Sequence, residues 1–456
     1  MAGLFDALGI TGGALMTHEY GIQVTGHNIS NVATPGYHRQ VLGLSARGPA
    51  TLGVTDAGVQ RVADSILGRR LAEERAAAGY ADTRADALAV LEALLAELGD
   101  TGLGAALDSF FGAWRELASA PQDLPARAAA LAATDSLAAR VRQVAADTHA
   151  AQVDADHRVR VALPTVNTRL DAVAALNRSI AINEAAGSAA PDLRDQREQA
   201  LQDLALLIGA QSFEDDRGQV AVSVAGVTLV QGDAVRHLTT VPDATTGFVR
   251  LTTADAAQVD LTRRLTGGEL GGQLALRDRD LAGLATALDA FAFDLATAVN
   301  AVHQGGVGAD GVSGRALFAP PAAVSGAAAA LALDAAVASA PDHLAAAQVA
   351  GAAGDGRNAS SLATLDQALV ANGGQLTLGA SLAANLAAIG ALVADAVDAQ
   401  AEQAGRLSAL ETLRESQSGV SLEEQMLMLD RYQRAFQAAS RVLSKIDEMF
   451  DSLLSM

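Results

Sequence analysis

The chain has 456 residues, which is enough for about three domains. Its formal net charge is −20 and its pI is near 4.7, which argues against a nucleic-acid-binding protein or one that binds an anionic membrane surface. It has no cysteine, so disulfides, thiol catalysis and cysteine-bound metals are excluded. No Lys or Arg precedes Arg39 and no run of about 18 residues is apolar enough to span a bilayer, so we expect neither a cleavable secretory signal nor a membrane span.

Residues 1–32 carry a helical pattern of apolar residues. One heptad row is apolar throughout, and a second row, three residues further on, is interrupted by polar residues. The first row comprises Met1, Leu8, Leu15, Ile22 and Ile29, and the second comprises Leu4, Thr11, His18, Thr25 and Val32. Several glycines here each weaken an isolated helix by up to about 1 kcal/mol. We therefore expect this helix to need a partner.

The helix is predicted to end within HNISNVATPGYHRQ, residues 27–40. Asn28 and Asn31 are poor residues for a helix interior. Pro35 lacks an N–H and disfavours helical geometry in the preceding residue, and Gly36 permits a turn that a side chain would resist. The chain therefore changes direction here, one helix after its start.

The middle of the chain is predicted to be mostly helical, with one β-rich segment. Residues 64–210 indicate long Ala-rich helices. From about residue 211 the period changes, since QVAVSVAGVTLVQGD alternates in the manner of a hairpin and GFVRLTT adds a strand. Helix returns at about 267 and extends to about 303. Residues 319–356 indicate a loosely packed Ala-rich insert, and helices resume from about 359 to 416.

We find no motif for catalysis, a cofactor or a metal. His18 and Glu19 could begin an HExxH zinc site, but Ile22 stands where the second His is needed. The turn-rich segment around Asp310 lacks the further oxygen ligands and the closing Glu of an EF-hand loop. We therefore expect no enzyme activity, no cofactor and no bound metal.

Residues 422–456 carry a second and more regular helical stripe. Ser421 and Glu424 form a capping box at its start. Its rows comprise Leu422, Leu429, Phe436, Leu443 and Phe450, and then Gln425, Tyr432, Ala439, Ile446 and Leu453. Two explanations remain open: the chain ends pair with each other or with copies of themselves, or two amphipathic helices close an ordinary globular core.

The opening segment, LFDALGITGGALMTHEYGIQVTGHNISNVATPGYHRQ, resembles the N-terminal segment of bacterial flagellar rod, hook and hook-associated proteins. The matching positions of this axial motif are Asn28, Ile29, Asn31, Thr34, Pro35, Gly36 and Tyr37, while Ser30 stands where the family often has Ala. Residues 110–127, 192–210, 267–306 and the C-terminal helix are similar to the FlgK family of hook-associated proteins.

The resemblance implies a mainly α fold with a small β-rich insert. It implies a long antiparallel helical rod built from both chain ends, with the terminal helices forming a coiled-coil inner domain. The expected division is 1–45 with 405–456 for the inner domain, 46–210, 267–304 and 357–404 for the rod, 211–266 for the β-rich insert and 305–356 for a Gly/Ala-rich insert.

The resemblance also implies a structural subunit of the extracellular flagellum at the junction between hook and filament. Such a subunit is exported unfolded without a cleaved signal, and its ends order on assembly. The implied partners are copies of itself in a ring, hook subunits, a second junction protein and an export chaperone on the C-terminal helix, without nucleic acid or membrane. The expected assembly interface comprises Leu8, Leu15, Ile22, Ile29, Leu422, Leu429, Tyr432, Phe436, Leu443, Ile446, Phe450 and Leu453. The alternatives are a hook or rod subunit, the second junction protein, or a cytosolic helical binding module.

Overall fold

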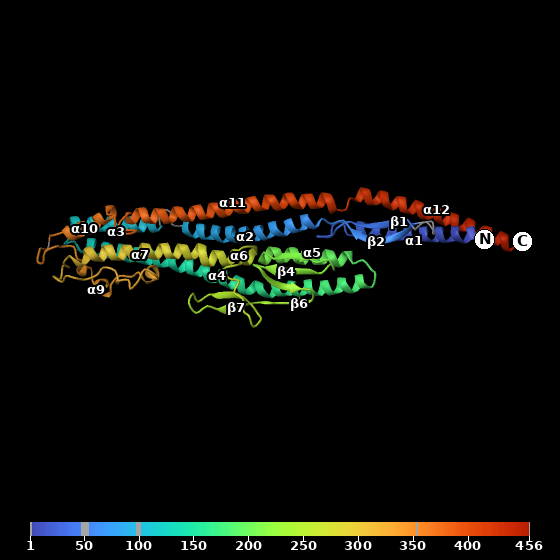
Figure 1. The fold of residues 1–456 in the computed structure, drawn as a ribbon. Coiled ribbons are helices and arrows are strands. Elements are labelled where there is room, and N and C mark those ends of the chain that lie inside the picture. The colour runs from blue at the N-terminus through green and yellow to red at the C-terminus, as the bar shows by residue number, and fades with distance from the viewer. Residues whose placement is uncertain (1, 47–53, 97–101, 353, 456) are drawn as a thin grey trace.

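The protein is an elongated bundle of helices with both termini at one end (Figure 1). The structure is a computed structural model that describes residues 2–46, 54–96, 102–352 and 354–455. The main helices are α1 (Ala2–Ser30), α2 (Ser65–Ala96), α3 (Leu103–Ser119), α4 (Leu124–Ala185), α5 (Pro191–Ile208), α6 (Gly268–Ala275), α7 (Leu281–Gln304), α11 (Leu378–Ser418) and α12 (Leu422–Leu454). The short helical elements are the π-helical turn η1 (Leu276–Asp280), α8 (Ala327–Ala330), α9 (Ala335–Ala338), η2 (Pro341–His343), α10 (Arg357–Thr364) and η3 (Leu365–Gln367).

Three small antiparallel sheets accompany the helices in the described residues. The first is the hairpin β1 (Gln40–Ala46) and β2 (Val54–Arg61). The second has the order β3 (Gln211–Glu214), β4 (Val220–Val224), β5 (Val227–Gln231) and β6 (Ala234–Val235), and the third pairs β7 (Leu238–Pro242) with β8 (Val249–Thr253). The mainly α fold with a small β-rich insert is confirmed. The β1–β2 hairpin was not predicted, and it crosses the boundary expected at residue 45.

The two terminal helices pair with each other and extend beyond the end of the rod (Figure 1). The rings of Phe5 and Phe450 lie 5.3 Å apart near the tip. Gly21 allows a close approach in the middle, because a Cβ atom there would lie 2.7 Å from the ring of Tyr432. The sequence left open whether the ends pair or close a globular core, and the structure pairs them as one antiparallel layer.

The row of α1 that is most buried is not the apolar one. Thr11 and Thr25, from the row with polar interruptions, are buried, whereas Leu15 and Ile22 of the apolar row are only partly buried. The threonines fit because each hydroxyl donates to the carbonyl four residues earlier, at 2.8 Å from Thr11 and 2.7 Å from Thr25. A threonine whose hydroxyl is satisfied within its own helix needs no polar partner when it is buried.

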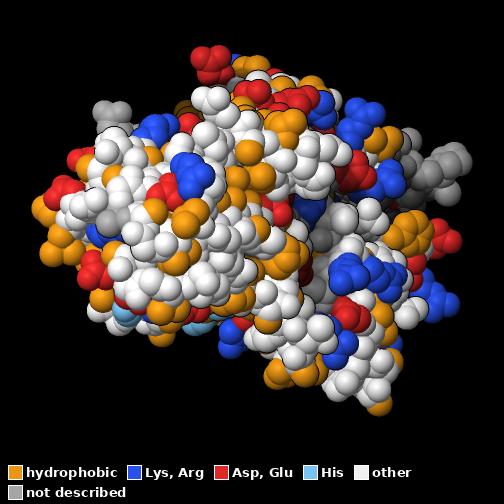
Figure 2. Space-filling model, turned by 90° about the vertical axis from the view of Figure 1, so that its left-hand side faces the viewer, with side chains coloured by type: hydrophobic (Ala, Val, Ile, Leu, Met, Phe, Trp, Pro, Cys, Tyr) orange, Lys and Arg blue, Asp and Glu red, His pale blue; other side chains and the backbone are white. Residues whose placement is uncertain are grey.

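The described residues of the rod form three buried hydrophobic clusters. The largest lies at the end far from the termini and centres on Phe110 and Trp114 of α3 and Phe291 of α7. The second joins α4 and α5 to the β-rich insert, and the third joins α2, α4, η1, α7 and α11. Seen from its far end, the rod carries charged side chains of both signs among scattered apolar ones (Figure 2).

The segment 305–356 is better packed than its composition indicated. Phe318, Val337 and Leu344 are fully buried and belong to the largest cluster. Asn300 of α7 holds this segment, since its side chain donates to the carbonyl of Phe318 at 2.9 Å and accepts from two successive backbone N–H groups. The expectation of a loose insert was therefore wrong, because small residues let the chain approach the helices closely.

The β-rich insert is held on α4 by polar groups. The predicted hairpin turn at Ala225 and Gly226 is confirmed, with φ of 50° and 78°. Arg277 of η1 pairs with Asp156 of α4 at 2.6 Å, and both side chains are 2% exposed. The same two groups bond the carbonyl and the N–H of Val249 in β8. This buried pair therefore fixes the insert to the rod.

We expected no stretch that is apolar enough to span a bilayer, and this expectation was wrong, because two helical segments reach the required mean hydropathy. Windows of 18 residues within Gly268–Gln304 and Leu378–Leu453 reach mean hydropathies of 1.4 and 1.7. Ala and Leu are the most frequent residues of both segments, and Leu288 and Phe291 of the first are buried in the rod. Core helices also reach such values, so hydropathy alone does not distinguish them from spanning helices.

His303 of α7 is fully buried and held as a neutral imidazole. Its Nδ1 donates to the carbonyl of Arg315 at 2.8 Å, and its Nε2 accepts from the N–H of Ala345 at 3.0 Å. Burial lowers the pKa of His303, since a charged ring would lose its hydration. A second proton on Nε2 would also face the N–H of Ala345.

We expect His303 to make the far end of the rod less stable in acid. The unfolded chain takes up the proton near pH 6.5 and the folded chain only at a lower pH. The contribution of neutral His303 to the free energy of unfolding is therefore complete above about pH 7 and falls as the pH drops below 6.5. Between pH 8 and pH 5, the thermal unfolding temperature of His303→Gln should fall by less than that of the parent chain. His157→Gln supplies the control, because it removes an imidazole from an exposed position; an equal effect of both variants would contradict the assignment.

Candidate functional site

The joint between the terminal helices and the rod is built around Asn28, near the end of α1. Its side chain is 1% exposed. Its amide nitrogen donates to the carbonyl of Gln40 at 2.8 Å and to Oε1 of Gln425 at 2.9 Å. Its oxygen accepts from the N–H of Gln40 at 2.9 Å and from the hydroxyl of Tyr37 at 2.7 Å. One side chain thus joins α1, the turn after it, β1 and α12.

The rest of the axial motif forms the turn that brings Tyr37 and Gln40 back to Asn28. Gly36 has a φ of +78°, a conformation that glycine adopts without strain. Burial and the nearby Asp192 and Asp195 raise the pKa of Tyr37, so its hydroxyl keeps the proton that it donates. Thr34 and Pro35 are exposed, with the Thr34 hydroxyl bonded to Asn31 at 3.1 Å. The predicted end of the helix and the turn are confirmed.

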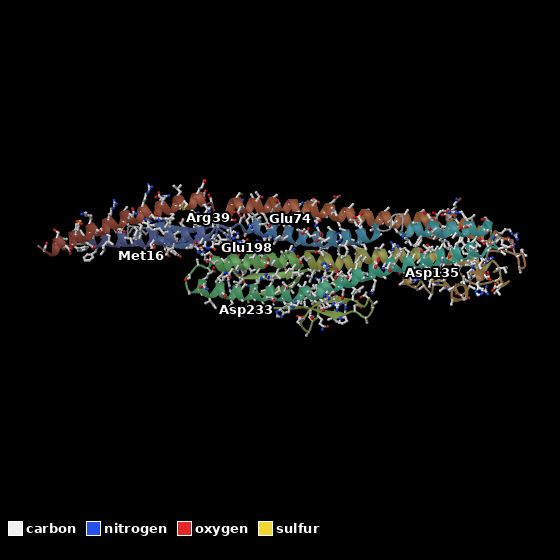
Figure 3. All side chains as sticks on the ribbon, turned by 180° about the vertical axis from the view of Figure 1, so that it is seen from behind. Met16, Arg39, Glu74, Asp135, Glu198 and Asp233 are labelled. Atoms are coloured by element: carbon white, nitrogen blue, oxygen red, sulfur yellow. The ribbon has the colours of Figure 1, made fainter. Side chains whose placement is uncertain are left out.

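An acidic face of α5 receives the chain as it leaves the turn. Asp195 bonds His38 through the ring at 2.9 Å and through the backbone N–H at 3.0 Å. Arg61 of β2 lies 2.8 Å from both Asp195 and Glu198. Asp192 contacts His27 of α1 at 3.2 Å. The terminal unit therefore meets the rod through charged and polar groups. Figure 3 labels Arg39 and Glu198 at this joint.

Sequence analysis missed the partners of the motif. The signal was present, because Asp192, Asp195 and Glu198 are spaced three residues apart and so share one face of a helix. Their role needed the long-range pairing with His38 and Arg61, which no local pattern reveals. Gln425 was assigned to a heptad row, but not to a hydrogen bond with the other end of the chain.

The structure brings the predicted interface residues together along the α1–α12 pair. Ile446 is buried, and most of the others are partly buried between the two helices. The partly buried set comprises Leu8, Leu15, Ile22, Ile29, Leu429, Tyr432, Phe436, Leu443 and Phe450. Leu422 and Leu453 are about half exposed, at 49% and 50%. Most of the predicted interface is thus occupied within one chain.

A different set of apolar side chains remains exposed on the terminal pair. On α1, Phe5 is 59% exposed and Met16 is 69% exposed. On α12, Leu427, Val442 and Met449 are 71%, 51% and 53% exposed. These residues lie off the two heptad rows, so the row pattern did not select them. Among the described residues, no group of three or more His, Asp or Glu side chains is placed to hold a metal.

Two family matches cover most of the chain. Residues 88–318, just over half of the chain, match the family described as flagellar hook-associated protein FlgK helical domain. The chain belongs to the FlgK family of flagellar hook-associated proteins. Residues 414–456 match the family described as flagellar basal body rod FlgEFG protein C-terminal. That second match covers α12 and the end of α11, the half of the terminal pair that follows the rod.

Individual relatives agree with this FlgK membership. Flagellar hook-associated protein 1 of Salmonella typhimurium is 30% identical over 316 residues, which cover 65% of this chain and only 56% of the relative. The Bacillus subtilis protein of the same name is 25% identical, with 100% of this chain and 99% of the relative covered. The flagellar hook junction protein FlgK from Burkholderia pseudomallei has a similar fold, with a TM-score of 0.68 at 17% identity over 77% of this chain and 100% of that one.

We expect Asn28→Asp to loosen the joint while leaving the rod intact. The carboxylate keeps the shape of the side chain but cannot donate to Gln40 and Gln425. Unsatisfied buried groups cost about 1–3 kcal/mol, so amide hydrogen exchange in β1 and at the start of α12 should accelerate about 10- to 100-fold. Asn31→Asp is the matched control, because the Asn31 side chain bonds only locally, to the carbonyl of His27 among others. Equal exchange in the two variants would contradict the role of Asn28.

Proposed function

We propose that this chain is a structural subunit at the junction between the hook and the filament of the bacterial flagellum. The observation that carries the proposal is the α1–α12 pair, a two-helix layer that extends from the rod with apolar side chains exposed on its outside. Exposed apolar surface of this kind marks a site of association. The FlgK family membership supports the choice of the flagellum and of this position in it.

The partners follow from the same layer. Copies of the chain arranged in a ring would cover Val442 and Met449 on α12 and Met16 on α1, while hook subunits and a second junction protein would adjoin the ring. Burying an apolar side chain contributes about 1.5–3 kcal/mol. Several such contacts per copy give assembly a substantial driving force. In the proposed arrangement 1–45 and 405–456 form the inner domain, and the rod segments and inserts lie outside it.

Export requires terminal helices that can stay unfolded until assembly. The chain passes unfolded through the type III export apparatus without cleavage of a signal, and a chaperone covers the stripe of α12 until assembly. Ordering a residue costs about 1–2 kcal/mol of backbone entropy, which a lone two-helix pair offsets poorly. The terminal helices therefore become fully ordered when neighbouring copies bury their outer faces.

The competing functions have less support. An enzyme needs converging reactive groups in a cleft, and the buried side chains of Asn28, His38 and Asp195 at the joint bond to neighbouring elements instead. A cytosolic binding module would bury its terminal helices against its own core, whereas these two stand apart from it (Figure 1). A hook or rod subunit would share the terminal pair, but the match at residues 88–318 is to the FlgK helical domain.

Deleting the gene for this chain tests the position in the flagellum. We expect electron microscopy to show finished hooks without filaments, and we expect unassembled flagellin in the culture medium. Both follow if the filament can grow only on the junction. Cells with normal filaments would contradict the proposal, and structures that end before the hook would move the chain to the rod or hook.

Charges placed on the outside of α12 test the assembly surface. Val442→Asp with Met449→Asp should leave the α1–α12 pair intact, since both side chains are about half exposed and lie off the two heptad rows, and should abolish incorporation into flagella. The control is Arg434→Gln with Arg441→Gln, which changes the net charge equally at exposed polar positions. Immunogold labelling of isolated flagella measures incorporation, and circular dichroism checks the fold. Normal labelling of the double aspartate variant would disprove this surface.

A further inference from the structure

The loop between η3 and α11 contains a tight turn at Asn372 and Gly373. Of the nine asparagines of the chain, Asn372 is the one that precedes a glycine. The N–H of Gly374 donates to the carbonyl of Ala371 at 3.1 Å, and the two residues between them have φ of 51° and 68°. Positive φ at both central residues is the pattern of a type I′ turn, in which Asn-Gly is the preferred pair. The turn geometry thus explains why Asn-Gly occurs here.

The turn leaves the side-chain amide of Asn372 and the backbone nitrogen of Gly373 uncovered. Both residues are exposed. Among the described residues, neither the Asn372 side chain nor the Gly373 N–H has a hydrogen-bond partner. The N–H of Asn372 is engaged instead, because it donates to Oδ2 of Asp294 in α7 at 2.9 Å. An amide carbon and a nitrogen that can attack it therefore lie next to each other in the chain without competing contacts.

The backbone around this pair is free to rotate. Ring closure between the nitrogen of Gly373 and Cγ of Asn372 needs a rotation about the Cα–C bond of Asn372. A Cβ atom added at Gly373 would meet nothing within 4 Å, and Gly374 follows with a φ of 85°. Two successive glycines tolerate many backbone conformations, and an exposed turn opens at a low free-energy cost. The attacking geometry is therefore accessible to the folded chain.

We propose that Asn372 is a site of spontaneous deamidation in the folded chain. Hydroxide takes the proton of the Gly373 N–H, and the nitrogen attacks Cγ of Asn372. A bond between the Gly373 nitrogen and Cγ forms and closes a five-membered succinimide ring. The bond from Cγ to the side-chain nitrogen breaks, and this nitrogen takes a proton from water and leaves as ammonia.

Water completes the reaction by opening the ring. It adds to one of the two ring carbonyls, the bond between that carbon and the ring nitrogen breaks, and the nitrogen of Gly373 regains a proton. Opening at Cγ gives aspartate, and opening at the backbone carbonyl gives isoaspartate, whose main chain passes through Cβ and Cγ. The reaction consumes only water, and both products carry a new carboxylate at residue 372.

The new carboxylate weakens the contact between the turn and α7. It belongs to the residue whose N–H donates to Asp294, so two negative charges then lie at this contact and repel each other. Isoaspartate also adds one carbon to the main chain of the turn. α11 begins shortly afterwards, where the hydroxyl of Thr377 accepts from the N–H of Ala380 at 3.1 Å. Deamidation therefore loosens the segment that leads into α11.

This inference goes beyond the proposed function, since the reaction needs only the folded chain and water. If copies remain in the flagellum after assembly, as proposed above, the modified fraction grows with the age of the structure. A chain that keeps its amide would leave the proposed position in the flagellum untouched, and a different position would leave the modification untouched.

Peptide mass spectrometry of the purified full-length chain tests the reaction. The chain is incubated in mildly alkaline buffer and digested in acid, and the loss of the side-chain amide is measured at Asn372 and Asn183. Asn183 is the internal control, because it is also exposed but donates to the carbonyl of Ser179 within α4 at 2.8 Å. We expect most of the amide to be lost at Asn372 while Asn183 keeps its own, and the loss to accelerate as the pH is raised. Equal retention at the two positions, or a rate that does not depend on pH, would overturn the inference.

Two variants test the effect on the turn. Asn372→Gln keeps an amide but would need a six-membered ring, which closes far more slowly, so this variant should keep its amide on ageing. Asn372→Asp introduces the carboxylate directly. Amide hydrogen exchange at residues 374–378 should be about 3- to 10-fold faster in Asn372→Asp and in the aged parent chain than in Asn372→Gln, the factor that one weakened hydrogen bond produces. Loss of the amide from Asn372→Gln, or equal exchange in all three proteins, would contradict the inference.

Discussion

The hydrogen bonds of Asn28 are the interaction on which the terminal end of the molecule depends. A buried amide that donates twice and accepts twice joins α1, the turn at Tyr37 and β1 at Gln40 to α12 at Gln425, which lies 397 residues further along the chain. No apolar side chain could set this geometry, because dispersion contacts have little direction. A short, directional hub therefore defines where the terminal pair ends and where the rod begins.

Other asparagine side chains bond backbone groups in the same way along the rod. Asn177 of α4 donates to the carbonyls of Val220 and Gly232, and Asn167 of α4 makes a two-way pair with the backbone of Leu238. Asn300 of α7 does the same for Phe318. In each case a helix side chain satisfies the backbone of an extended segment, which would otherwise be buried unpaired. Helices form the frame, and asparagines attach the inserts to it.

The sequence predicted the elements better than their partners. Periodicity located α12 and its Ser421 cap, which accepts from Glu424, and the turn at Ala225 and Gly226. It ranked the Leu15 row of α1 above the Thr25 row, because a heptad count cannot see a hydroxyl satisfied within its own helix. It also missed the β1–β2 hairpin, whose strands contain several small residues. The acidic face of α5 had no visible meaning until His38 and Arg61 were placed against it.

The polar character of the joint explains why the apolar surface stays available. If apolar packing fixed the α1–α12 pair to the rod, side chains such as Val442 and Met449 could be buried against the rod of the same chain. They would then not be exposed. The ion pairs of Asp195 and Glu198 instead fix the orientation of the terminal pair on the rod without burying apolar surface. Two tasks are thus separate that a single hydrophobic core would merge: orientation is set within one copy, and in the proposed ring the outer faces are buried by neighbouring copies.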